Sequence, residues 1–158
     1  MKNLDQIDWE IIALLNKDGR MPHAEIERRL KNVSARTINN RIEALVKAGI
    51  INIRAVINPE KVGYGVMAEV FIETEPGEQR AVAEKAAEFP QVSYSSCASG
   101  EKDVILSVRA RSIAELFDFV SEELGNIPGV RHTQTHLMPL KIKSNAAWIP
   151  GEYLDEYE

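Results

Sequence analysis

Residues 34–47 read SARTINNRIEALVK and decide the fold of the N-terminal part of the chain. Ile38, Ile42 and Leu45 recur at helical spacing, which is typical of a helix with one buried face. Ser34 can cap this helix because its hydroxyl can accept an amide hydrogen of the first turn. The stretch is therefore predicted to be a helix with a buried apolar stripe and an opposite polar face.

Two amphipathic segments precede this helix, and a β-rich segment follows it. Residues 4–17 place apolar side chains at helical spacing, and Pro22 suits the first turn of a second helix. Residues 50–57 are rich in β-branched residues and are predicted to form one or two short strands before Asn58–Pro59. Three short helices followed by a β element predict a winged helix-turn-helix over residues 1–58.

The polar face of the third helix carries side chains that suit the major groove of DNA. Asn can pair bidentately with adenine and Arg with guanine, so we expect Arg36, Asn39 and Asn40 to read bases. Two adjacent Asn are poor helix formers, which a purely structural helix has little reason to carry. The cations expected to hold phosphates are Arg41, Lys47 and Arg54. A three-helix bundle with a polar outer face is the alternative.

The net charge supports a division between the two parts. The 158-residue chain has 19 Lys and Arg against 24 Asp and Glu, a net charge of −5 and a pI near 5.3. Residues 1–58 hold ten basic against seven acidic residues, whereas residues 59–158 hold nine against seventeen. The first part is therefore +3 and the second −8. A basic module can attract phosphate whatever the sign of the whole chain.

The second part alternates element types. A hinge over residues 59–65 leads to a domain over 66–143, and a tail over 144–158 follows. The predicted elements are strands at 66–74, 92–98, 103–110 and 130–142, with helices at 77–89 and from the capping Ser112 to Leu124. The order β-α-β-β-α-β predicts an α+β, ferredoxin-like domain. Its sheet has one face without helices, which favours pairing with a second copy.

The sequence offers little for enzyme chemistry. Cys97 lies in a predicted strand and is expected to be a small buried core residue. His132 and His136 are four residues apart, which on a strand is about 13 Å and too far for one metal ion. We therefore expect no catalytic residue, no metal and no cofactor. The N-terminus lacks a secretory apolar segment, so the expected compartment is the cytoplasm.

Several stretches in both parts together carry a resemblance to the Lrp/AsnC, or feast/famine, family of transcription regulators. They are Leu4-Asp5-x-x-Asp8, Asp18-Gly19-Arg20, Ser34-x-x-Thr37-x-x-x-Arg41-Ile42, Gly49-Ile50-Ile51, Asn58-Pro59, Ser99-Gly100-x-x-Asp103 and Pro128-Gly129-Val130-x-x-Thr133-x-Thr135. The resemblance runs from about residue 4 to residue 143.

The resemblance implies a regulator of double-stranded DNA that dimerises through its second domain and often assembles into octamers. It adds Ser34 and Thr37 to the DNA-binding residues named above. It also implies a small-molecule effector, usually an amino acid, bound between subunits. The residues that match the family's effector loop and facing strand are Ser99, Gly100, Asp103, Gln134, Thr135 and His136.

Two other functions share this architecture. Sirohaem decarboxylases resemble it, but they typically begin the second domain with a stretch that contains His and Trp. Residues 62–68 read VGYGVMA and contain neither. An effector-binding assembly protein that does not bind DNA is the second alternative.

Overall fold

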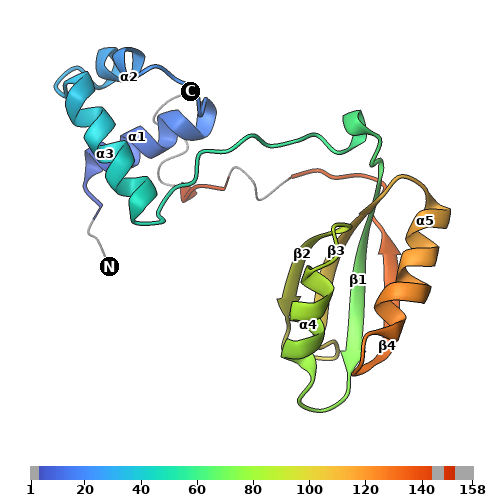
Figure 1. The fold of residues 1–158 in the computed structure, drawn as a ribbon. Helices are drawn as coiled ribbons and strands as arrows, with labels where there is room; N and C mark the ends of the chain where they lie inside the picture. Colours follow the sequence, from blue (N-terminus) through green and yellow to red (C-terminus); the bar gives the residue numbers. More distant parts are fainter. Residues whose placement is uncertain (1–3, 144–147, 152–158) are drawn as a thin grey trace. The chain divides into compact units, whose positions relative to one another are not determined.

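A computed structural model describes residues 4–143 and 148–151 and divides them into two units (Figure 1). The N-terminal unit comprises the described residues up to Val56, together with Lys143 and residues 148–151. The C-terminal unit is Ile57–Ile142. The described part of the predicted tail therefore belongs to the N-terminal unit rather than standing apart.

Three helices form the N-terminal unit: α1 (Gln6–Lys17), α2 (His23–Leu30) and α3 (Ala35–Lys47). Local sequence sets their ends. The Asp5 carboxylate accepts the Asp8 amide at the start of α1, and the Ser34 hydroxyl caps α3. The buried apolar side chains of the three helices meet in one core, which consists of Ile11, Leu14, Met21, Ile26, Ile38, Ile42 and Leu45.

The β-rich segment after α3 does not form the predicted strand. Residues 51–58 have neither helical nor strand hydrogen bonding in the structure. A strand needs a neighbour to supply its ladder of hydrogen bonds, and the described chain places no strand beside this segment. The prediction of strands at residues 50–57 is therefore wrong for the single chain, although the three helices are as predicted.

The C-terminal unit follows the predicted order of elements. After a short 3₁₀ turn, η1 (Glu60–Val62), come β1 (Val66–Thr74), α4 (Gln79–Ala87), β2 (Val92–Cys97), β3 (Val104–Ala110), α5 (Ile113–Asp118) and β4 (Val130–Leu137). The four strands form one antiparallel sheet in the order β2-β3-β1-β4. Helices α4 and α5 cover one face of it (Figure 1).

Strict alternation along β1 separates the two faces of the sheet. Ala68, Val70 and Ile72 are fully buried beneath the helices, and the residues between them are only partly buried. Strand β3 repeats this pattern. The core of the unit therefore lies on one side, and the other side of the sheet has no helix over it among the described residues.

Two predicted elements are shorter than expected. The helix that follows Ser112 ends at Asp118 and continues as a π-helical turn, η2 (Phe119–Glu123), and a 3₁₀ turn, η3 (Leu124–Asn126). The Asn126 side-chain amide donates to the Glu122 carbonyl at 2.6 Å, which takes this carbonyl out of the helical ladder. Strand β4 ends at Leu137 rather than at residue 142, because Pro139 has no amide hydrogen to continue pairing with β1.

Candidate nucleic-acid interface and effector site

Helix α3 presents one continuous polar stripe. Arg36, Asn40, Glu43 and Lys47 recur every three or four residues, and all four are exposed. The opposite side of the helix is buried, because Ile38 and its neighbours Ile42 and Leu45 fill the core. The stripe is therefore rigidly supported and free to meet a ligand.

The first turn of α3 is held by its cap. The Thr37 amide donates to the Ser34 hydroxyl at 3.2 Å, and the two side-chain oxygens lie 3.0 Å apart. One turn further along, the Asn39 side-chain amide donates to Glu43 Oε1 at 2.8 Å. Asn39 is partly buried and already paired, whereas Asn40 is exposed on the stripe. Asn40 is thus the more accessible of the two amides predicted to read bases.

Arg41 occupies a different environment from the one predicted. Its Nη1 donates to Asp5 Oδ2 at 2.8 Å and to Asp8 Oδ1 at 2.7 Å, which joins α3 to the start of α1. The Asp8 residue is only 4% exposed, so its carboxylate needs a countercharge. A hydrogen bond from the Asp8 amide, followed by the Arg41 guanidinium, lowers the pKa of Asp5 below its ordinary value of 3.8.

This arrangement makes Arg41 a poor phosphate ligand, and we revise its predicted role to that of a strut between two helices. Two carboxylates already neutralise its charge, and moving it to DNA would leave the buried Asp8 carboxylate without a countercharge. The sequence signal was present in Asp5-x-x-Asp8, which the structure shows to be a capping box at the start of α1.

The other predicted phosphate ligands are available. Lys47 lies in the last turn of α3, and Arg54 lies in the segment without regular structure that follows it. Both are exposed, and neither forms an ion pair within the described residues. Arg36 is exposed as well, and none of the three cations forms an ion pair within the described residues.

The predicted effector loop is the turn between β2 and β3. Ser99 and Gly100 are exposed at its tip, and Gly100 has a φ of 142°, a conformation that side chains rarely adopt. Asp103 ties the end of this turn to β1, because the Thr74 amide donates to its Oδ2 at 2.8 Å. This hydrogen bond, with a smaller contribution from the Gln79 side chain, lowers the pKa of Asp103 below 3.8.

The predicted facing strand is β4, at the opposite edge of the sheet. Strands β3 and β1 separate it from β2, so one chain does not bring the two sets of residues together. The register also divides the set. Gln134 and His136 pair with Phe71 and Glu69 on the uncovered face, whereas Thr135 pairs with Val70 and lies on the helical face.

Two other sequence-based expectations concern isolated reactive groups. Cys97 is exposed at the end of the edge strand β2, so the prediction that it is a buried core residue is wrong. Residues 4–143 and 148–151 contain no cluster of three or more His, Cys, Asp or Glu that could hold a metal ion.

In the same part of the chain, no helix is long and apolar enough to cross a membrane.

Each of the two units matches a known protein family model. Residues 4–52 match a family model described as winged helix-turn-helix DNA-binding, and residues 67–148 match one described as the Lrp/AsnC ligand binding domain. A two-unit architecture with an N-terminal DNA-binding module and a C-terminal ligand-binding module defines a transcription regulator. The chain belongs to the Lrp/AsnC family.

Relatives that are named as regulators are similar in sequence to most of this chain. An uncharacterized HTH-type transcriptional regulator of Pyrococcus horikoshii is 38% identical over 136 residues, which is 85% of this chain and 85% of that protein. The HTH-type transcriptional regulator FL11 of Pyrococcus furiosus is 33% identical and covers 93% of this chain and 96% of its own length. These relatives are named as regulators and not as enzymes, so the protein is a DNA-binding regulator rather than a decarboxylase.

Solved structures share the fold. LrpC of B. subtilis is 25% identical, with a TM-score of 0.77 over 90% of this chain and 99% of that one. A transcriptional regulator of Neisseria meningitidis, solved in complex with L-Met, is 24% identical, with a TM-score of 0.86 over 95% of this chain and 99% of that one. At this identity the second comparison concerns the fold alone.

Replacing Arg41 tests its role as a strut. Arg41→Ala should lower the free energy of unfolding of the N-terminal unit by about 1–3 kcal/mol, because Asp8 loses its buried countercharge. Urea unfolding followed by tryptophan fluorescence measures this loss, since both tryptophans belong to the N-terminal unit. The control, Arg36→Ala, removes an exposed arginine of the same helix and should leave the stability nearly unchanged. Equal effects of the two substitutions would contradict the assignment.

Asp103 should make the stability of the C-terminal unit depend on pH. Its pKa in the folded state lies below 3.8, so its contribution is present above that pH and is lost as the pH falls through the lowered value. Asp103→Asn should therefore destabilise the protein at pH 7, and the difference from wild type should shrink at acidic pH. Urea unfolding followed by circular dichroism at both pH values checks this, with the exposed Glu101→Gln as the control.

Proposed function

We propose that α3 enters the major groove of DNA and that its exposed stripe reads the operator. The observation that carries this proposal is the stripe itself, in which Arg36 and Asn40 lie on a helix whose other face is buried. Arg suits guanine, and Asn suits adenine. Glu43 on the same stripe can accept a hydrogen bond from cytosine. In this proposal, Ser34 and Thr37 position the first turn of the helix, and Asn39 supports the stripe through Glu43.

Phosphate binding in this proposal falls to Lys47 and Arg54. Their charges have no internal partner among the described residues, so DNA phosphates can neutralise them without breaking an ion pair. The N-terminal part carries a net charge of +3, which favours this surface for the encounter with DNA. We place this regulator in the cytoplasm, with the DNA that it binds.

We further propose that an amino acid modulates DNA binding and is held between copies of the C-terminal unit. Within one chain, strands β3 and β1 lie between β2 and β4, and in this proposal a second copy completes the site. Ser99 and Gly100 would offer turn amides to the α-carboxylate. Gln134 and His136 would select the side chain. The match of residues 67–148 to the Lrp/AsnC ligand binding domain supports a small-molecule ligand, and the Neisseria protein of the same fold was solved with an amino acid, L-Met.

The same proposal assigns the uncovered sheet face to dimerisation. Met67, Phe71 and Ile105 lie on this face, and each is only partly buried by its own chain. A face-to-face pair of sheets would cover them. Asp103 contributes by holding the effector turn through Thr74 rather than by contacting the ligand. Assembly of these dimers into an octamer is the larger form that we propose.

Two substitutions separate base reading from phosphate binding. Asn40→Ala should reduce the preference for operator over random DNA, because a good bidentate contact discriminates by about 1–3 kcal/mol. Arg54→Ala should weaken binding to every sequence and reduce the slope of log K against log salt by about one. Mobility-shift titrations at several salt concentrations measure both. If the two variants behave alike, this division of roles is wrong.

A thermal-shift screen of the twenty amino acids tests the effector site. A ligand that binds only the native state stabilises it by about 2.7 kcal/mol at one hundred times its Kd, so the melting temperature should rise for the effector alone. Gln134→Ala should abolish this rise, whereas Ser121→Ala, an exposed polar residue outside the proposed site, should retain it. A shift that survives Gln134→Ala would place the ligand elsewhere.

A further inference from the structure

Helix α1 is apolar on more than one side. Ile11 and Leu14 are fully buried in the core of the three helices. Trp9, Ile12 and Leu15 widen this apolar surface around the helix and are only partly buried, although Ile12 and Leu15 also pack against the edge of the core. The apolar surface of α1 is therefore wider than the core of the three helices covers, and its outer part can bury a further apolar side chain.

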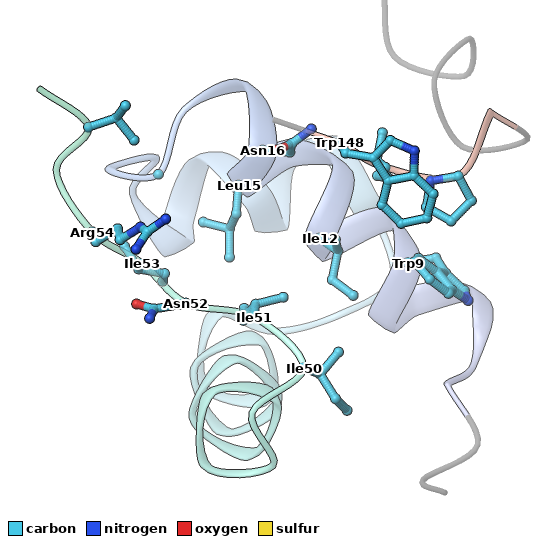
Figure 2. A pocket seen from close by; sticks show the side chains of 14 residues that line it. Trp9, Ile12, Leu15, Asn16, Ile50, Ile51, Asn52, Ile53, Arg54 and Trp148 are labelled. Atoms are coloured by element: carbon cyan, nitrogen blue, oxygen red, sulfur yellow. The ribbon is translucent and has the colours of Figure 1, made fainter. Parts of the chain in front are cut away.

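A groove of about 600 Å³ runs along this second side (Figure 2). One wall is α1, and the second is the segment Ile50–Arg54 that follows α3. The third wall is Trp148–Pro150, from the far end of the chain (Figure 2). Trp9, Asn16 and Trp148 all line this groove (Figure 2).

A single side chain anchors this third wall. Ile149 is 6% exposed, whereas its neighbour Trp148 is 72% exposed. Burial of this isoleucine requires apolar side chains around it, and α1 and Ile50–Arg54 provide them. The charges of the two partners are also complementary. Residues 144–158 contain four acidic and no basic residues, against the net +3 of residues 1–58.

We propose that α1 and Ile50–Arg54 form a docking surface for the C-terminal tail of the same chain, which binds through residues 148–151, and that the docked tail is a second tether of the DNA-binding unit. The first tether is the segment after Val56 that leads into the C-terminal unit. The described part of the tail, residues 148–151, belongs to the N-terminal unit, and Ile149 is buried there. A unit attached at two points has less orientational freedom than one attached at a single point.

The consequence of the second tether rests on the proposed function. Two N-terminal units of a dimer must meet two half-sites at a fixed spacing, about one DNA turn apart. Limiting the freedom of each unit lowers the entropic cost of meeting both sites at once. The tail would therefore matter for DNA that carries two half-sites and not for a single half-site.

Docking can be measured without DNA, because the only tryptophans are Trp9 and Trp148. In a Trp148→Phe background, Trp9 reports alone on the groove. Ile149→Asp should favour the undocked tail by about ten- to a hundredfold, which is the cost of losing one buried isoleucine. Acrylamide quenching of Trp9 should then increase. The control, Gly151→Asp, adds the same charge two residues away into open space and should leave the quenching as it is. Unchanged quenching in Ile149→Asp overturns the proposal.

Cross-linking decides which chain supplies the tail. Asn16→Cys and Trp148→Cys in a Cys97→Ser background place one thiol on α1 and one on the tail, at two residues that line the same groove. A short bis-maleimide should join them within one chain, and the product should migrate as a monomer on a denaturing gel. A product of twice the mass shows that the tail of a second copy occupies the groove, which overturns docking within the chain.

DNA binding tests the tether. Ile149→Asp should bind a duplex with two half-sites at least several-fold more weakly than Gly151→Asp does, and both should bind a single half-site equally. If wild type binds both duplexes and Ile149→Asp matches it on each, the tether is wrong. If wild type binds neither duplex, the proposed function fails, while the quenching of Trp9 still decides whether the tail docks.

Discussion

The burial of Ile38, Ile42 and Leu45 is the constraint on which the DNA-binding surface depends. These side chains fill the space between three short helices and fix the rotation of α3 about its axis. Once that rotation is set, the opposite side chains can only point to solvent. The stripe that contains Arg36 and Asn40 is therefore a consequence of core packing. A helix free to roll would present a mixture of faces and could not distinguish one base from another.

The basic residues of the N-terminal unit are of two kinds, those paired with carboxylates and those left unpaired, and the sequence alone does not distinguish them. Arg41 and Arg54 are both basic residues near the predicted reading helix, yet only Arg54 is free of ion pairs with described residues. Arg41 is held by Asp5 and Asp8, because a carboxylate as buried as that of Asp8 needs a cation beside it. Counting charges gives the sign of the field, whereas the pairing decides which cations are available to DNA.

In the C-terminal unit, too, the sequence predicts only part of the arrangement of the sheet. The alternation of Val70 and Ile72 with partly buried residues predicts which side of β1 faces the helices. It does not say that the effector turn and Gln134 lie at opposite edges, because that follows from the strand order. The turn residue Asp103 could equally have met a ligand or its own loop. The structure assigns it to the Thr74 amide, since that amide lies within 2.8 Å of its carboxylate.

Local patterning of the sequence determined the helices α1 to α3, the order of strands and helices, and the family, because caps, turns and apolar periods act over a few residues. Tertiary structure decided what depends on distant partners. Residues 51–58 form no strand because no neighbour pairs with them. Arg41 became a strut because Asp8 is buried beside it. Ile149 is buried because α1 and Ile50–Arg54, which are distant in the sequence, surround it, and no local pattern can predict such a contact.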